Sequence, residues 1–167
     1  TGGECLLRRD FKELYLHLWN KHIYVTVMTN GTLLTEEYVE FFKVYQPDMI
    51  QISLYGSSEA GYLSVTGHKG FEKAVHAIKA LQKADIDVRV VTTPNKYMGD
   101  DYINILKFCH ENGISISTPD ISLMTTRYDP DKDDYFLTED EIFDLSKRRV
   151  ELKRELIPLS CVPDPFG

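Results

Sequence analysis

The segment HIYVTVMTNG, residues 22–31, decides the fold class. From Ile23 to Met28 the residues are mostly β-branched or apolar at both odd and even positions, which is typical of a strand covered on both faces. The run stops at Asn30-Gly31, two residues that tolerate positive φ and favour a turn. A buried strand that ends in a short polar turn is a common unit of parallel sheets, and the rest of the chain repeats it.

Segments of strand and helix character alternate on both sides of residues 22–31. Further strands are expected at residues 48–56, 86–94 and 114–119. Helices are expected at residues 8–21, 36–45, 71–85 and 100–113, and residues 57–70 are expected to form a loop. Repeated βα units of this size predict an α/β fold with a parallel sheet, either doubly wound or a partial barrel.

Composition limits the classes of protein that the chain can belong to. Hydrophobic residues make up 43% and charged residues 27% of its 167 residues, as in soluble globular proteins. The net charge of −7 argues against a non-specific binder of nucleic acid or of an anionic membrane, because such a protein needs a basic face. The sequence shows no signal-peptide pattern and no apolar run of membrane-spanning length. Its three cysteines predict no dense disulfide framework, so a reducing cytoplasm is the simpler location.

Polar, glycine-rich stretches follow the predicted strands, and one more, TGGE, opens the chain at residues 1–4. Ligands of parallel α/β sheets bind where the strands end, so these stretches are expected to meet a small molecule. In TGGE the glycines would let the backbone approach a ligand closely, and Glu4 could accept charge-assisted hydrogen bonds from an amino group. Two glycines and an acid before a helix also occur in ordinary connecting turns, so the order of all the motifs carries the argument.

The series TGGE, amphipathic helix, strand ending in TNG and strand ending in ISLYG resembles the radical SAM enzymes, from Thr1 to about Pro119. The resemblance implies a partial (β/α)6 TIM-like barrel with parallel strands, truncated before strand 2, that binds S-adenosylmethionine and a [4Fe-4S] cluster. The stretch GGECLL and residues 53–78 look most like the peptide- and protein-modifying branch, whose members carry SPASM or twitch domains with auxiliary clusters.

The resemblance also implies which residues would line the cofactor pocket. They stand at the strand ends: Gly2, Gly3, Glu4, Thr29, Asn30, Ser53, Thr92 and Thr93. The Gly-Gly-Glu turn would contact the amino group of S-adenosylmethionine, and Ser53 would help to hold its carboxylate or ribose. Many relatives have an arginine near Thr66 that clamps the carboxylate, and here Lys69 is the candidate substitute. Arg89 lies inside a predicted strand and faces either the barrel interior or the helices.

The superfamily binds its cluster with a C-x-x-x-C-x-x-C loop ahead of the Gly-Gly-Glu turn, and this sequence has no such motif. We therefore expect the cluster ligands upstream of residue 1 and interpret the chain as a fragment with no catalytic residue of its own. Cys5 and Cys109 are expected to pack as small residues. Cys161 is a candidate ligand of an auxiliary cluster, although a lone cysteine near a chain end is as often uninvolved.

The last part of the chain is expected to form an extension. Thr138 and Glu141 form a capping-box pattern that predicts the start of a helix at residues 139–156. We assign residues 1–119 to the barrel core. Residues 120–167 are assigned to an irregular segment, this helix and a linker toward an auxiliary-cluster domain.

The predicted function is that of part of a radical SAM enzyme. Such an enzyme cleaves S-adenosylmethionine reductively at a [4Fe-4S] cluster, and a 5′-deoxyadenosyl radical then removes hydrogen from the substrate, here a peptide or protein. The enzyme would need an electron donor, would work in the cytoplasm and would not engage nucleic acid or membrane, and the isolated chain is expected to be inactive. An ordinary (β/α)-barrel lyase or isomerase, and a non-catalytic SAM-binding or scaffold domain, are the alternatives.

Overall fold

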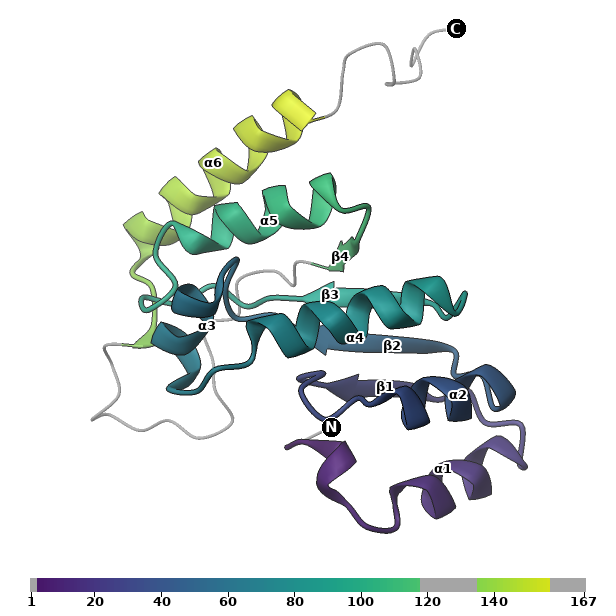
Figure 1. Ribbon diagram of the computed structural model, residues 1–167. Coiled ribbons are helices and arrows are strands. Elements are labelled where there is room, and N and C mark those ends of the chain that lie inside the picture. The colour runs from purple at the N-terminus through teal and green to yellow at the C-terminus, as the bar shows by residue number, and fades with distance from the viewer. Residues whose placement is uncertain (1–2, 118–134, 157–167) are drawn as a thin grey trace, which may run out of the picture.

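The computed structural model describes residues 3–117 and 135–156, and it confirms the predicted α/β fold (Figure 1). Gly2 and Cys161 lie outside the described residues. The strands are β1 (Thr26–Thr29), β2 (Met49–Ser53), β3 (Val88–Val91) and β4 (Ser115–Ser117). A short 3-10 helix, η1 (Cys5–Leu7), precedes α1 (Phe11–Trp19), α2 (Glu36–Val44), α3 (Glu59–Thr66), α4 (Phe71–Lys83), α5 (Asp101–Glu111) and α6 (Glu139–Leu156).

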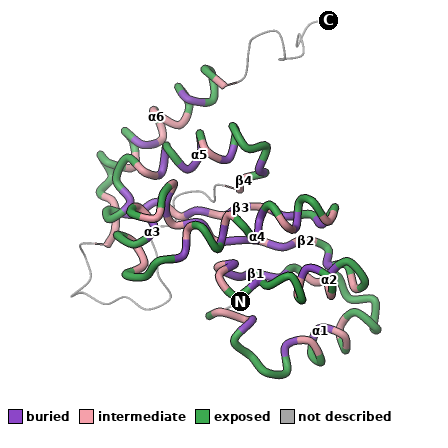
Figure 2. The backbone as a smooth tube through the Cα atoms, viewed as in Figure 1, coloured by how far each residue is buried: buried purple, intermediate pink, exposed green. Residues whose placement is uncertain are grey.

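The four strands form one parallel sheet in the order β1-β2-β3-β4, and the register fixes which side chains share a face. Buried positions alternate with half-buried or exposed ones along the strands (Figure 2). The buried positions form the helix-side face, which includes Val27, Ile50, Ile52, Val88 and Val90. The other positions form what we call the open face.

The expectation that residues 23–28 are covered on both faces is wrong. Met28 lies on the open face and is 43% exposed. Ile23 and Tyr24, which suggested a second buried face, precede the strand and are 48% and 89% exposed. An apolar run can therefore be half strand and half surface turn, and its composition does not tell the two apart.

The helices bury the faces that their periodicity predicts, with one exception. In α4 the buried residues Ala74, Ala77, Ile78 and Leu81 form a stripe against the sheet. In α1 the rings of Phe11 and Tyr15 pack against Phe42 of α2 at centroid distances of 6.4 and 5.5 Å. Leu14 stands three residues after Phe11, at helical spacing for the same face, yet it is 46% exposed. The short helix contacts its neighbour through aromatic rings along a narrower stripe than the sequence suggested.

The expected loop at residues 57–70 contains a helix, α3, so that prediction was wrong. The Ser58 hydroxyl accepts a hydrogen bond from the Gly61 N–H at 3.1 Å and caps the helix, and Gly67 ends it at a φ of 72°. Tyr62 is the buried residue of α3. A helix that buries one side chain has no apolar stripe, and the periodicity test could not find it.

Helix α6 packs against α5 and begins at the predicted capping box. The Glu141 Oε2 atom accepts from the Thr138 N–H at 2.7 Å, and the Glu141 N–H donates to the Thr138 hydroxyl at 3.3 Å. Leu145 and Leu152 are buried on the side that faces α5. Within residues 3–117 and 135–156, none of the helices combines the length and the apolar character needed to cross a bilayer.

Candidate functional site

The predicted strand-end residues gather at the carboxyl edge of the sheet. Thr29 is the last residue of β1 and Ser53 the last of β2, while Thr92 and Thr93 directly follow β3. Because all strand pairs are parallel, these residues share one edge. The Gly3-Glu4 turn joins them through η1, which contacts β1.

Glu4 fastens the turn across the end of β1. Its Oε1 atom accepts hydrogen bonds from the Thr29 hydroxyl at 2.7 Å and from the Leu6 N–H at 3.0 Å. Its Oε2 atom accepts from the Asn30 N–H at 2.8 Å. A carboxylate offers about four acceptor positions, so one position on Oε2 remains for a further donor. The site therefore holds one oriented negative charge with room for one more hydrogen bond.

Thr29 and Asn30 belong to this arrangement in different ways. The Thr29 side chain lies on the helix-side face, is 4% exposed, and also accepts from the Gly31 N–H at 3.0 Å. Thr29 thus orients, from the helix side of the sheet, both the Glu4 carboxylate and the turn that follows β1. The Asn30 side-chain oxygen accepts from the N–H and the hydroxyl of Thr32 at 2.9 and 2.7 Å, which shapes the turn.

The three remaining predicted residues that the structure describes divide between the two faces. Ser53 and Thr93 are half-buried, and Ser53 lies on the open face. Thr92 points to the helix side, is 1% exposed, and places its hydroxyl 3.7 Å from the Met98 sulfur. The register places Ser53 next to Asn30, whose N–H donates to Glu4, whereas Thr92 is part of the core.

Sequence reasoning missed the residues that hold the loop after β2. The Asp101 side chain, from the start of α5, accepts from the Ser57 N–H at 2.9 Å and from the Ser57 hydroxyl. The Glu59 carboxylate accepts from the N–H groups of Gly70 and Glu72 at 2.7 and 3.2 Å, at the start of α4. For Asp101 the available signal was an acid at the start of the helix predicted at residues 100–113, whereas Glu59 stood in a predicted loop and gave no such signal.

Comparison with known proteins agrees with this geometry. The model of the radical SAM superfamily matches residues 1–109. The chain belongs to the radical SAM superfamily. Its radical SAM relatives include the AdoMet-dependent heme synthase of Nitratidesulfovibrio vulgaris, which is 29% identical over 114 residues, or 68% of this chain and 31% of the relative. The sporulation killing factor maturation protein SkfB of Bacillus subtilis is 32% identical over 117 residues, 70% of this chain and 28% of SkfB.

A solved radical SAM structure confirms the fold. Streptococcus suis SuiB bound to S-adenosylmethionine superposes with a TM-score of 0.72 at 19% identity, covering 93% of this chain and 35% of SuiB. The present chain spans about a third of the length of these relatives. The family match thus confirms the assignment of residues 1–109 to the superfamily, the superposition shows the fold, and the activity of a whole enzyme is a matter for proposal.

The cysteines of this radical SAM chain that the structure describes do not form a metal site. Within residues 3–117 and 135–156 there is no group of three or more metal-binding side chains. Cys109 is fully buried in α5, and burial raises the pKa of its thiol to about 12. Cys5 lies 3.2 Å from the Met28 carbonyl, and burial followed by the nearby Glu4 carboxylate raises the pKa of its thiol. Both stay protonated at neutral pH, as expected of packing residues.

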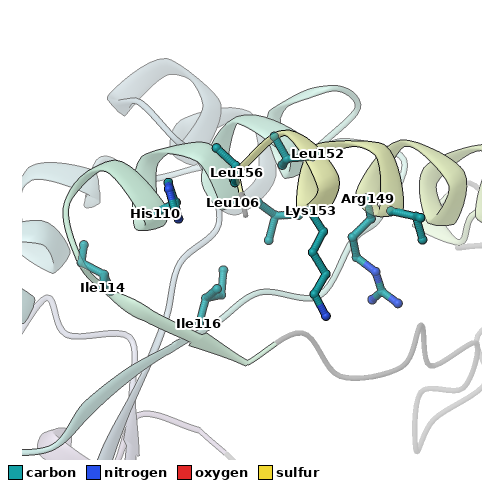
Figure 3. A pocket seen from close by; sticks show the side chains of 9 residues that line it. Leu106, His110, Ile114, Ile116, Arg149, Leu152, Lys153 and Leu156 are labelled. Atoms are coloured by element: carbon teal, nitrogen blue, oxygen red, sulfur yellow. The ribbon is translucent and has the colours of Figure 1, made fainter. Parts of the chain in front are cut away.

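A groove of about 490 Å³ lies elsewhere on the radical SAM chain, between α5, α6 and β4 (Figure 3). Its lining includes Leu106 and His110 of α5, Ile116 of β4, and Arg149, Leu152 and Lys153 of α6. Ile116 belongs to the helix-side face of the sheet. None of the predicted cofactor residues that the structure describes lines this groove, so it is separate from the carboxyl-edge site.

Proposed function

We propose that this chain is the part of a radical SAM enzyme that binds S-adenosylmethionine at the carboxyl edge of the sheet, in an enzyme that modifies a peptide or protein. The observation that carries the proposal is the Glu4 carboxylate, which accepts hydrogen bonds from the Leu6 N–H, the Thr29 hydroxyl and the Asn30 N–H at that edge. Membership of the superfamily supports the same cofactor.

The edge has the chemistry that the amino group of S-adenosylmethionine requires. The acceptor position left on the Glu4 Oε2 atom suits a cationic amino group, because a charge-assisted hydrogen bond is about twice as strong as a neutral one. Gly3 has a φ of +127°, a conformation that side chains rarely allow, and so the turn needs glycine there. Ser53, on the open face of the neighbouring strand, would contact the ribose or the carboxylate.

Each residue at the edge would have a limited task. Glu4 would fix the amino group, Thr29 would keep the Glu4 carboxylate oriented, and the Asn30 turn would close one side of the site. When bound with a reduced [4Fe-4S] cluster, S-adenosylmethionine would supply the one-electron chemistry that ends in removal of a hydrogen atom from the substrate. The contribution of the protein is positioning and the exclusion of water.

The described residues do not fit the cluster itself. Cys5 and Cys109 belong to different parts of the core, and the described part of the chain offers no third ligand near either. We assign no step to a cluster on these residues. The proposal is that its ligands are encoded upstream of residue 1, which the coding sequence tests directly.

A peptide or protein substrate is proposed because several relatives are named for such work. SkfB is a maturation protein for sporulation killing factor, and AlbA of Bacillus subtilis, 36% identical over 92 residues, is a subtilosin biosynthesis protein. SuiB has also been solved bound to its precursor peptide SuiA. A cytoplasmic location and an electron donor for the cluster belong to the same proposal.

The test is a binding titration with the full-length protein. S-adenosylmethionine and glucose 6-phosphate would each be titrated by calorimetry into the wild type, Glu4→Gln and the exposed-site control Glu13→Gln. We expect the wild type and Glu13→Gln to bind S-adenosylmethionine alike, and Glu4→Gln to bind it roughly tenfold more weakly or worse, as loss of a charged hydrogen bond implies. Preference for the phosphate ester would favour an ordinary barrel enzyme and would overturn the proposal.

A further inference from the structure

Arg89 lies in the middle of the open face of the sheet. Its neighbours in β3, Val88 and Val90, are 6% and 0% exposed and point to the helices. Arg89 therefore points to the opposite side, and it is half-buried there. The sequence left both directions open, and the strand register decides between them.

The residues beside Arg89 on this face are polar and uncharged. Register places Gln51 of β2 on one side of Arg89 and Ser115 of β4 on the other, with Met28 beyond Gln51. We call Gln51, Arg89 and Ser115 the polar row. At about 3.3 Å per residue, the row lies roughly 6.6 Å below the strand-end layer that contains Ser53.

The polar row has unused hydrogen-bonding capacity. Within residues 3–117 and 135–156, the Arg89 guanidinium makes no ion pair, and the side chains of Arg89, Gln51 and Ser115 make no hydrogen bond. The nearest acid along the same face of β3 is Asp87, two residues toward the amino end and exposed to solvent. A half-buried guanidinium with five donors favours an anionic partner.

We propose that the polar row binds a carboxylate group of the substrate. The planar guanidinium of Arg89 would hold both carboxylate oxygens, and the Gln51 amide and the Ser115 hydroxyl would donate from either side. The substrate would enter over the open face, below the cofactor held at the strand ends. The proposal rests on the proposed function, and it narrows the substrate to a peptide or protein with an acidic side chain or a free C-terminus at the site of reaction.

The experiment measures how fast phenylglyoxal modifies Arg89 in the full-length protein, followed by mass spectrometry of the Arg89 peptide. Glutarate, a dicarboxylate, is the probe, and glutaramide is its neutral counterpart of similar shape. Arg9, exposed and distant in sequence, is the internal control in the same sample. We expect glutarate to slow modification of Arg89 several-fold and to leave Arg9 unchanged, while glutaramide protects neither. Equal rates at Arg89 with and without glutarate would overturn the proposal.

A second arm separates the substrate from the cofactor, since S-adenosylmethionine also carries a carboxylate. Equilibrium dialysis would compare its binding to the wild type, Arg89→Gln and Arg9→Gln. We expect all three to bind it alike, with glutarate protection still present when it is bound. Weakening of about tenfold or more in Arg89→Gln alone would assign Arg89 to the cofactor and overturn the substrate site. A wild type that binds no S-adenosylmethionine, yet shows glutarate protection, would instead contradict the proposed function.

Discussion

The Asp101 carboxylate accepts from both the N–H and the hydroxyl of Ser57, a residue that stands 44 positions earlier in the chain. Asp101 begins α5, which follows β3, whereas Ser57 lies in the loop that follows β2. The interaction therefore fastens one strand-end loop to the helix of the next βα unit. Ser53 precedes this loop, so a helix of the next βα unit helps to shape the candidate site.

Replacing Asp101 by Asn should loosen the loop after β2. An amide is uncharged and has one acceptor oxygen. The hydrogen bond from the Ser57 N–H therefore loses its charge assistance, and the Ser57 hydroxyl must turn to accept from the amide NH2, at a cost of about 0.5–1.5 kcal/mol. Amide hydrogen exchange of Ser57 in the full-length protein should accelerate correspondingly. Asp100→Asn is the matched control, because Asp100 is 81% exposed and its ion pair with Arg148 is at the surface, where such pairs contribute at most about 1 kcal/mol. Equal exchange rates in the two variants would contradict the proposed fastening.

Gly61→Ala should destabilise the protein although alanine favours helices. A methyl group at Gly61 would collide with the Asp101 carboxylate, and the gain of about 1 kcal/mol in helix propensity would not offset the broken contacts. We expect a lower urea midpoint for Gly61→Ala and a nearly unchanged one for Ser64→Ala, an exposed position in the same helix. A rise in the midpoint of Gly61→Ala would show that the loop moves aside freely.

Glu4→Gln should lower stability as well as cofactor binding. The N–H groups of Leu6 and Asn30 donate to different oxygens of the carboxylate, so an amide nitrogen in either position faces one N–H. The unfolding free energy should fall by about 1–3 kcal/mol. Urea denaturation would measure it, with Glu13→Gln expected within about 0.5 kcal/mol of wild type because Glu13 is exposed. A Glu4→Gln protein as stable as wild type would mean that the turn is held by other contacts.

Stability should decrease above pH 9 because of Cys109. Burial raises the pKa of its thiol from the usual 9.0 to about 12, so between these values the unfolded chain releases a proton that the folded chain keeps. The protonated thiol of Cys109 makes its full contribution to the free energy of unfolding below pH 9. This contribution is lost as pH rises toward 12, by at most about 1.4 kcal/mol per pH unit. Burial also raises the pKa values of Tyr15 and Tyr62 from 10.0 to about 12, so these two residues lower the stability at higher pH than Cys109 does.

Cys109→Ala isolates the effect of the thiol. Urea midpoints measured at pH 8, 9 and 10 should fall less steeply for this variant than for wild type, whatever the constant cost of the smaller side chain. Identical slopes would show that Cys109 is more accessible to solvent than its position in α5 implies.

The sequence allowed the order of strands and helices to be predicted because each long helix buries a periodic stripe. In α5 the apolar residues at helical spacing, Tyr102, Ile105, Leu106 and Cys109, are all buried. The short helix α3 was not predicted, because a cap and a single buried tyrosine stabilise it and it has no periodic apolar stripe. Thr35, a residue type that often caps helices, directly precedes α2, but its side chain makes no capping hydrogen bond. Periodicity thus reports burial well and local hydrogen bonding poorly.

The candidate site was predictable as a set of strand ends, whereas the role of each residue was not. Residues of opposite parity at one strand end point to opposite faces, and so Thr92 packs in the core while Thr93 does not. The same limit applied to Arg89, whose direction depends on a strand boundary that sequence fixes only within a few residues. The hydrogen bond from Thr29 to Glu4 joins positions 25 residues apart, and no local pattern encodes it.

The strands stand in the sheet in the order in which they occur in the chain. Each of the strands β2, β3 and β4 pairs with the strand made just before it, so during synthesis the sheet could grow by one βα unit at a time. When consecutive units pair, the segment of chain between the two strands is short, so little chain entropy is lost at each step. A nascent chain stalled after β3 would already contain the paired β1, β2 and β3, although Ser57 would still lack the α5 carboxylate that fixes its loop.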